Sequence, residues 1–471
     1  MKKLFLYGCG KRCDILLEHI QNTEYQVCGI VDSNQQKWGK IIKDIMVLNP
    51  EILKNQKDVY VCVTFYSSLD NETIWMDLKE QYGIGYEYQL SFNDIMIESY
   101  KNISIPEKIN DNSTESIFLD ATWGLGLGGV EAWIRDTMGY FKENGIDNVS
   151  LLTSLNKCGL NTNRYNIIDF SYEDTMVFSD EYIEKGIQFI KNNLPCTLIF
   201  SRVNELLLAA YIIKKIYPDK VNIVMVVHGS SDGMIRDVLS YRHEIDKYIC
   251  VSKSIKENII SKGVSSDKVY YMTIPIKQDL TKTRVYSNDI NNPIRIGYAG
   301  RIEIFEKRAD IMLKLIRTLE KINIPYEMNI AGSGSYYNNV SDYIMHHSLK
   351  NHIHMIGVIP REDIAEFWIH QDIAINVSDN EGRPISNMEA MLYGAVPVVT
   401  ETMGILDDVR NGENGIIVPI NDYKTMAEKI VYLSENRDIL KRMSQKASRE
   451  IKSKISMDEY ISLWKSVLYG Y

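Results

Sequence analysis

Two glutamates eight residues apart, Glu381 and Glu389, stand in a stretch whose residue types could bind a hydroxyl-rich ligand. A predicted strand over 373–377 precedes them, and the predicted helix that follows ends near Gly394. We therefore expect Glu381 at the carboxyl end of a parallel strand, where open α/β sheets bind ligands, and Glu389 about two turns into the helix. A carboxylate there suits paired hydrogen bonds to vicinal hydroxyls, as on a ribose. Gly382 permits close backbone approach, and the helix N-terminus offers unpaired N–H groups.

Two cations follow another predicted strand, over 294–299. Gly300 and Arg301 come directly after it, and Lys307 stands six residues after Arg301. Two cations at a strand end can neutralise a diphosphate, and the Arg guanidinium can bind it bidentately. Taken alone, such cations more often form a surface ion pair, and lone glutamates are often solvated charges.

The middle third adds two features that also lie at predicted strand ends. Gly128 and Gly129 open a predicted helix after a strand over 117–119, which would bring backbone N–H groups to an anion. His228 ends a predicted strand over 223–227. Paired glycines are usually just a turn, and a lone histidine is usually structural. The joint placement of these residues at strand ends favours one shared ligand site.

Strands and helices alternate along the chain in three sets, which predicts parallel sheets. Polar, aperiodic stretches at about 100–115 and at 286–293 separate the sets. The fold class we predict is α/β, with three Rossmann-like units. The predicted limits are a first domain over 1–100, a linker over 101–115, a second domain over 116–285, a third over 286–455 and a last helix over 456–471.

Composition excludes several classes of protein. The 471 residues allow about three domains. Apolar residues at 45% and charged residues at 24% are ordinary for a folded, soluble chain. The net charge of -9 argues against a generally basic nucleic-acid binder, so no nucleic-acid partner is expected, although a local basic patch stays open.

Targeting signals and cysteines indicate the compartment. The start MKKLFLYGCG lacks an apolar run for a signal peptide, and no stretch reaches the roughly 18 apolar residues of a membrane span. We therefore expect a cytoplasmic protein. The seven scattered cysteines are expected to be reduced thiols. Cys9 and Cys13 lack a second Cys/His pair, so no metal site is predicted.

The pattern EG-x-P-x4-EAM over 381–391 resembles the signature of retaining family 4 glycosyltransferases, also called glycosyltransferase group 1. The resemblance covers roughly residues 116–471. Further matches in the family's order are the GG-x-E loop at 128–131, His228-Gly229, V-S-x-S at 251–254, the glycine turn at 331–334 and the segment 357–359. The stretch IPIKQD at 274–279 departs from the family's IPNGVD, which leaves the hinge between domains open.

This resemblance implies the GT-B fold: two Rossmann-like domains facing across a cleft, here preceded by a small third one. The range 116–285 would bind the acceptor, and 286–455 would bind the donor. The last helix, 456–471, would cross back to the acceptor domain. The implied reaction transfers a sugar from a nucleotide diphosphate sugar to an acceptor hydroxyl, with retention of configuration and no required metal or other cofactor.

The resemblance also implies residue roles. Arg301, Lys307 and the glycine loop would bind the diphosphate, Glu389 the ribose and Glu381 the sugar hydroxyls, while His228 would position the sugar. The implied catalytic residues are Glu381, His228, Arg301 and Lys307. The implied donor-binding residues are Gly128, Gly129, Gly300, Val358, Gly382, Arg383, Pro384, Ile385 and Glu389.

Arg383 departs from the family, since many members carry an apolar residue at this position. Two interpretations are open for this side chain. It could bias which sugar is accepted, or it could simply point to solvent.

The first hundred residues carry half of a dinucleotide fingerprint. Gly8 and Gly10 fit its first two glycines, but Cys13 replaces the third. Asp32 stands 22 residues after Gly10, near the position of a ribose-binding acid. The segment resembles small Rossmann domains attached to sugar-modifying enzymes. A scaffold or interaction module is the favoured interpretation, and binding of NAD or another nucleotide at Gly8, Gly10 and Asp32 is the alternative.

The sequence thus predicts a hexosyltransferase for bacterial surface polysaccharide or lipid-linked glycan synthesis. A UDP-sugar is the expected donor and a glycan or lipid-linked molecule the expected acceptor. Peripheral contact with the cytoplasmic face of the inner membrane stays open. The alternatives are a protein or teichoic-acid acceptor, an NAD-binding oxidoreductase or sensor, and a non-catalytic sugar-nucleotide-binding partner.

Overall fold

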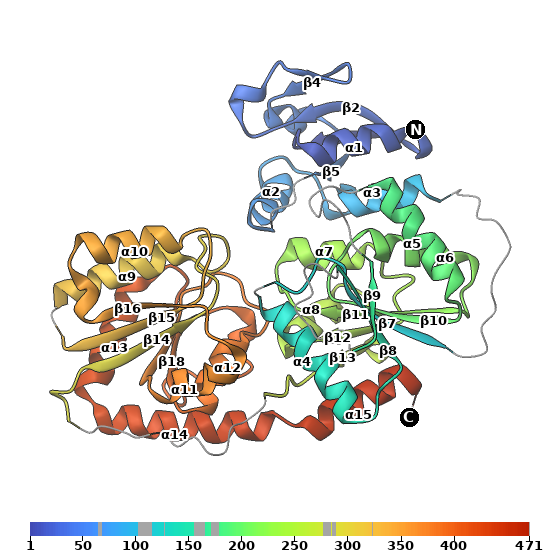
Figure 1. Cartoon of the computed structure of the whole chain (residues 1–471). Coiled ribbons are helices and arrows are strands. Elements are labelled where there is room, and N and C mark those ends of the chain that lie inside the picture. The colour runs from blue at the N-terminus through green and yellow to red at the C-terminus, as the bar shows by residue number, and fades with distance from the viewer. Residues whose placement is uncertain are drawn as a thin grey trace. The chain divides into compact units, whose positions relative to one another are not determined.

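The computed structural model describes residues 1–64, 68–101, 115–126, 128–154, 165–170, 179–276, 284, 289–322 and 324–470. The predicted linker lies mostly outside these residues, as do Leu127 and the segment 277–279. The described strands form three sheets, one within each predicted set (Figure 1). The α/β prediction is therefore confirmed.

The N-terminal sheet has the strand order β3-β4-β2-β1-β5-β6. Its pairs are parallel except for the short hairpin β3–β4. The strands are β1 (Lys2–Tyr7), β2 (Tyr25–Val31), β3 (Ile41–Ile42), β4 (Ile45–Leu48), β5 (Tyr60–Val63) and β6 (Gln89–Ser91); the helices are α1 (Lys11–His19), α2 (Ser68–Glu80) and α3 (Phe92–Ser99). Buried Val31, Val61 and Leu78 form part of its core. The strand order reverses between β1 and β5.

The middle sheet has the order β13-β12-β11-β10-β7-β8-β9. Its strands are β7 (Ser116–Ala121), β8 (Val149–Thr153), β9 (Ile167–Asp169), β10 (Cys196–Phe200), β11 (Val221–Val227), β12 (Lys247–Cys250) and β13 (Val269–Tyr271). Its helices are α4 (Gly129–Glu143), α5 (Asp180–Asn192), α6 (Glu205–Ile216), α7 (Asp232–Leu239) and α8 (Lys253–Ser261). Every residue of β10 is buried, as expected for a central strand with both faces covered.

The C-terminal sheet is parallel throughout, in the order β16-β15-β14-β17-β18-β19, and helices cover both of its faces (Figure 1). Its strands are β14 (Ile294–Ala299), β15 (Tyr326–Ala331), β16 (Ile353–Gly357), β17 (Ile373–Asn376), β18 (Val396–Thr400) and β19 (Ile416–Val418). Its helices are α9 (Ala309–Ile322), α10 (Tyr337–His346), α11 (Ile364–Ile369), α12 (Ile385–Leu392), α13 (Tyr423–Glu435), α14 (Arg437–Lys454) and α15 (Met457–Tyr469).

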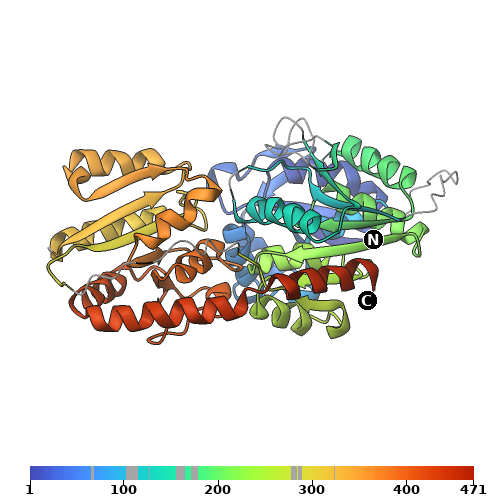
Figure 2. The same cartoon turned by 60° about the horizontal axis from the view of Figure 1, so that its bottom comes forward.

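Five strands were not predicted: β3, β4, β6, β9 and β13. Each is only two to four residues long. The chain ends in two consecutive helices, α14 and α15, drawn in red in Figure 2.

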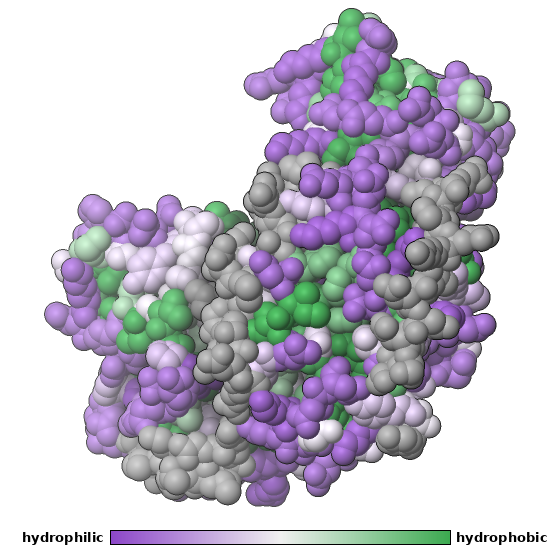
Figure 3. Space-filling view, turned by 45° about the vertical axis from the view of Figure 1, so that its right-hand side comes forward, coloured by the Kyte–Doolittle hydropathy of each residue, from purple (hydrophilic) through white to green (hydrophobic). Residues whose placement is uncertain are grey.

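No helix in the described part of the chain is long and apolar enough to cross a bilayer. Hydrophilic residues dominate the face shown in Figure 3, with apolar residues scattered among them.

Packing divides the chain into two compact units. One combines residues 1–125, 137–226 and 231–248, and the other combines 126–136, 227–230 and 249–471. Two short segments of the middle third thus belong to the same unit as the C-terminal sheet. These segments carry Gly128, Gly129 and His228. The domain limits drawn from the sequence stay a prediction.

Candidate active site

The strand order of the C-terminal sheet reverses between β14 and β17, which pair through Ile296–Ile373 and Gly297–Ala374. Ligands of open α/β sheets bind outside the carboxyl ends of the strands at such a switch point. The loop after β14, residues 300–308, carries Arg301 and Lys307. The loop after β17, residues 377–384, carries Glu381. The topology therefore brings both predicted sets of charges to one sheet edge.

Glu381 is a buried carboxylate with three donors on one oxygen. Its Oε1 accepts from Lys307 Nζ at 2.6 Å, Ser378 Oγ at 2.8 Å and Asn376 Nδ2 at 3.1 Å. Burial raises the pKa of Glu381, but the charge of Lys307 and the bonds from Ser378 and Asn376 outweigh it and hold the pKa below the ordinary glutamate value. Glu381 is therefore an ionised, firmly oriented group.

Lys307 sits in an unusual backbone. Its neighbours Glu306 and Arg308 have φ of 57° and 49°, a region that non-glycine residues rarely adopt. The loop is held to the β17 side by the bond from Asp379 N to Glu306 O at 3.0 Å and by the Arg308–Asp379 ion pair at 3.4 Å. Such strain clusters at functional sites, where surrounding structure enforces it. Here it presents the Lys307 ammonium to Glu381.

Arg301 does not join this pair in the structure. Its guanidinium donates to Glu303 Oε2 at 2.7 Å and to Glu306 Oε2 at 3.2 Å, both in its own loop. The side chain is 35% exposed, so a ligand can reach it. A diphosphate role for Arg301 requires an exchange of these partners and stays a prediction.

The segments 126–136 and 227–230 belong to the same compact unit and carry further predicted site residues. A Cβ on Gly382 would collide with the backbone oxygen of His228, so only glycine fits there. Ser230 Oγ donates to Asn380 Oδ1 at 3.0 Å. The His228 ring packs edge-on against Trp133 of α4, with centroids 4.8 Å apart. The structure thus places His228 beside the Glu381 loop.

Helix α4 begins at Gly129, directly after Gly128, and Ala132 N donates to Gly128 O at 3.0 Å. No atom would lie within 4 Å of a Cβ at Gly129, so its backbone faces open space. The Glu131 carboxylate folds back over Gly128. The N-terminus of α4 therefore carries N–H groups without an intrahelical partner, with the Glu131 carboxylate beside them.

The glycine turn after β15 holds the β14 loop in place. Gly332 and Gly334 have φ of 131° and 156°, and a Cβ at either would meet backbone of residues 300–302. Gly300 N donates to Ala331 O at 3.1 Å. Val358, one of the implied donor-binding residues, is 50% exposed after Gly357. These residues line the same sheet edge.

Arg383 does not point to solvent, so that interpretation is wrong. Its side chain is fully buried, and Nε and NH2 each donate to Asp408 at 2.8 Å, while the guanidinium lies 5.8 Å from the centre of the Tyr271 ring. Buried hydrogen bonds of this kind fix a loop. Arg383 anchors the chain between Gly382 and Pro384, the N-cap of α12. Ile385 is the first residue of that helix.

Glu389 is 3% exposed on α12 and forms an ion pair with Arg361. Arg361 also donates to Asp136 Oδ2 of α4 at 2.8 Å. Burial raises the pKa of Glu389 above the ordinary glutamate value, and the Arg361 charge opposes that rise. The sequence analysis missed Arg361, although it stands three residues after Val358 in the loop that follows β16.

Several buried polar atoms near this edge lack a hydrogen-bond partner within the described chain: Asp379 Oδ1, Arg383 NH1, Asn387 Nδ2 and Thr402 Oγ1. Buried polar groups are normally paired, so such a group needs an explanation. A polar ligand bound at the switch point would supply a hydrogen-bond partner to those of these atoms that it can reach.

The carboxylate of Asp32, in the N-terminal sheet unit, is filled by hydrogen bonds from neighbouring residues. It is 1% exposed, and its carboxylate accepts from Cys9 N at 3.2 Å, Asn34 N at 2.9 Å and Lys37 Nζ at 3.0 Å. Burial raises the pKa of Asp32, but these donors together hold it below the ordinary aspartate value. Trp38 Nε1 donates to the Asp32 backbone oxygen at 2.7 Å. This filled carboxylate supports the scaffold interpretation of the loop after Gly8 and Gly10.

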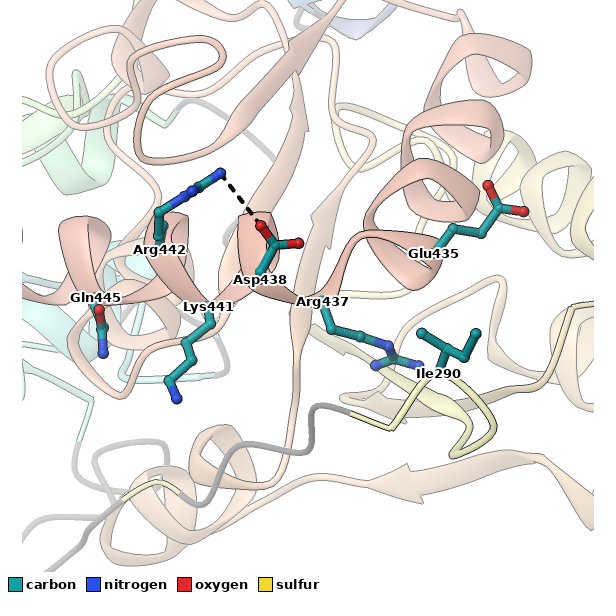
Figure 4. A pocket seen from close by; sticks show the side chains of 7 residues that line it. All are labelled: Ile290, Glu435, Arg437, Asp438, Lys441, Arg442 and Gln445. Atoms are coloured by element: carbon teal, nitrogen blue, oxygen red, sulfur yellow. Dashed lines mark ion pairs between the residues drawn. The ribbon is translucent and has the colours of Figure 1, made fainter.

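Other features of the described residues carry no predicted site residue. The hollow in Figure 4 is lined by Ile290 and by α13–α14 residues, with an Asp438–Arg442 ion pair at 3.6 Å. The six cysteines within the described ranges are unpaired thiols. The described ranges also hold no group of three His, Cys, Asp or Glu side chains arranged to bind a metal.

Comparison with known proteins identifies the class. Residues 282–450 match the family described as Glycosyl transferases group 1, and residues 1–84 match C2185-like, N-terminal. The chain therefore carries a group 1 glycosyltransferase domain and an additional N-terminal domain. The solved structures that it resembles are GT-B glycosyltransferases, and the GT-B prediction is confirmed.

Two curated relatives illustrate the match. An uncharacterized glycosyltransferase of Methanocaldococcus jannaschii, MJ1178, is 22% identical over 50% of this chain, and the chain spans 65% of that relative, short of two thirds. Poly(ribitol-phosphate) alpha-N-acetylglucosaminyltransferase of Staphylococcus aureus is 22% identical over 78% of this chain and 81% of that protein.

Two solved structures have the same fold. Anabaena Alr3699/HepE in complex with UDP-glucose superposes with a TM-score of 0.61 at 15% identity, covering 76% of this chain and 100% of that one. A mutant of S. aureus TarM in complex with fondaparinux, alpha-GlcNAc-glycerol and UDP gives a TM-score of 0.50 at 13% identity and covers 100% of both chains. At these identities the likeness defines the fold alone.

Proposed function

We propose that the protein is a retaining glycosyltransferase that moves a hexose or N-acetylhexosamine from a UDP-sugar to a hydroxyl of a bacterial surface glycan. The observation that carries the proposal is the Lys307–Glu381 pair at the switch point, beside the Gly382–His228 contact. The UDP complexes of similar folds support the nucleotide.

The reaction breaks the bond between the anomeric carbon and the diphosphate oxygen, and the electron pair leaves with the diphosphate. Lys307, Arg301 and the N–H groups at Gly128 and Gly129 stabilise that charge. Glu381, kept ionised by Lys307, accepts hydrogen bonds from sugar hydroxyls. His228 positions the sugar.

The acceptor oxygen then bonds the same face of the anomeric carbon, and its proton passes to the departing phosphate oxygen. Retention follows from this front-face geometry. The site needs no separate protein base for such a step, because the leaving group itself takes the proton. Glu389 binds the ribose hydroxyls throughout.

A polyol-phosphate polymer of teichoic-acid type is a second acceptor candidate. One relative acts on poly(ribitol phosphate) by its name and aligns with this chain over 415 residues. Lipid-linked glycan acceptors and a cytoplasmic location, peripheral to the membrane, remain part of the first proposal. Both acceptors use the same donor site.

The test is transfer from UDP-glucose, UDP-galactose and UDP-GlcNAc to lipid-linked glycan or poly(ribitol phosphate), with NMR of the product's anomeric proton. An α-linked product from these α-linked donors supports the proposal. Glu381→Gln should lose at least about a hundredfold in kcat. The matched control is Glu428→Gln, an exposed glutamate on α13. A β-linked product, or an active Glu381→Gln enzyme, would contradict the mechanism.

A further inference from the structure

Arg361 links two elements at the buried carboxylate of Glu389. It is the first residue of the 3-10 turn Arg361–Asp363, after Pro360. One guanidinium nitrogen, NH1, donates to Glu389 Oε1, and the other, NH2, donates to Asp136 Oδ2 at 2.8 Å. Both contacts lie within one compact unit. The guanidinium is thus fixed at both ends.

Within the described ranges, two charged side chains act on Glu389, one positive and one negative. Arg361 faces it from the loop after β16, and Asp136 faces it from α4. On α11 the acid Glu366 pairs with His370 at 2.8 Å, on an exposed face. Helix α14 contacts α12 through serine hydroxyls, which donate to the carbonyls of Leu392 and Gly394. Arg361 is therefore the cation that balances Glu389.

The charge state of Glu389 matters for a diol ligand. An ionised carboxylate only accepts hydrogen bonds and can take two from neighbouring hydroxyls. A protonated carboxyl carries its own O–H and no longer offers this paired acceptor. A carboxylate this deeply buried takes up a proton when its cation is removed, because burial disfavours the charged form.

We propose that Arg361 is a positioning residue of the donor site, whose guanidinium, anchored on Asp136, keeps Glu389 ionised and aimed at the two ribose hydroxyls. This inference rests on the proposed function, since it takes Glu389 as the ribose-binding group. It assigns Arg361 no contact with the reacting atoms. Its effect is on nucleotide affinity, with kcat largely retained.

The sign of the pH dependence follows from the charges. In Arg361→Met the attractive charge is lost while burial and the negative Asp136 remain, so the pKa of Glu389 rises further. The binding-competent ionised form is then lost as pH falls through this raised pKa. Asp136→Asn removes a repulsive charge, so the pKa of Glu389 falls and the ionised form persists to lower pH.

The experiment is calorimetric titration of the full chain with UDP from pH 8.5 to pH 6.5, for wild type, Arg361→Met, Arg361→Lys and Asp136→Asn. Each Kd is divided by the wild-type Kd at the same pH, which cancels the ionisation of UDP itself. For Arg361→Met the ratio should rise as pH falls, by up to about tenfold per pH unit below the new pKa. Arg361→Lys should restore a nearly flat ratio, and Asp136→Asn should not show the rise.

The outcomes separate the two proposals. If wild type binds no UDP, and no GDP or ADP in its place, the proposed function fails. If wild type binds and the Arg361→Met ratio is constant across pH, Arg361 has only a structural role and this inference is overturned. The double variant Arg361→Met/Glu389→Gln is the internal check, because a neutral amide cannot titrate and its ratio should be flat. Circular dichroism melts confirm that each variant is folded.

Discussion

The N-terminal and C-terminal sheets have the same kind of switch point but fill it in opposite ways. After β2 the acid Asp32 is bound by Cys9, from the loop after β1, and by Asn34 and Lys37 of its own loop. After β17 the acid Glu381 is bound by Lys307, 74 residues away, and lies beside His228. The first arrangement closes a loop, whereas the second assembles charges from several segments. An acid at a strand end is therefore not by itself evidence of a ligand site.

The largest effect is expected at the anchor within the C-terminal site. Arg383→Met keeps the side-chain volume but takes the bidentate cation from buried Asp408 and leaves it only Lys454 Nζ at 3.7 Å, which should cost about 3–5 kcal/mol of unfolding free energy. Chemical denaturation measures this loss. Arg410→Met breaks only half-exposed ion pairs and should cost about 1 kcal/mol or less. If both variants are equally stable, Arg383 is not the anchor described here.

Removal of Lys307 tests the C-terminal site, where the charges come from several segments of the chain. Lys307→Met should reduce kcat about 10²–10³-fold, because it removes the cation that holds Glu381 ionised and that we propose to stabilise the diphosphate. The pKa of Glu381 should rise, so the residual activity should fall further as pH decreases. Steady-state kinetics over pH measure both effects. Lys314→Met, at an exposed site on α9, should behave as wild type.

An added methyl group tests the close approach at Gly382, and the same change at Gly10, by the N-terminal switch point, is the control. Gly382→Ala places its Cβ on the His228 carbonyl, so the loop must shift, at a cost of about 1–3 kcal/mol in stability or in transition-state binding. The Cβ of Gly10→Ala would meet no atom within 4 Å, so stability and transition-state binding should both be unchanged. Thermal melts measure the loss of stability, and kcat/KM measures the loss of transition-state binding. An active, stable Gly382→Ala protein would show that the tight contact is not needed.

The smallest effect concerns Asp32. Asp32→Asn should cost about 1–2 kcal/mol of stability at neutral pH and leave glycosyl transfer unchanged. Because the folded-state pKa of Asp32 lies below its unfolded value, its contribution is present above about pH 4 and is lost as pH falls through the folded pKa. Denaturation at pH 7 and pH 3 checks the difference. Binding of NAD that Asp32→Asn abolishes would contradict the scaffold interpretation.

Sequence reasoning located the framework well because long buried strands and strand-end residues have strong local patterns. The strand 294–299 and the residues after it illustrate this. The partners that cross the chain could not be read in this way. Arg361 and Asp136 are 225 residues apart, and no periodicity relates them. The burial of Arg383 against Asp408 was missed for the same reason, since a surface charge and a buried anchor look alike in one sequence.

The central claim is that the C-terminal switch point binds a nucleotide sugar. Thermal shifts of wild type and Glu389→Ala with UDP-, GDP- and ADP-sugars and NAD test it most directly. A ligand at 100 times its Kd stabilises the protein by about 2.7 kcal/mol. The account predicts a shift with one nucleotide sugar, a UDP-sugar, that is weakened in Glu389→Ala. A shift with NAD alone, unchanged by that substitution, would contradict it.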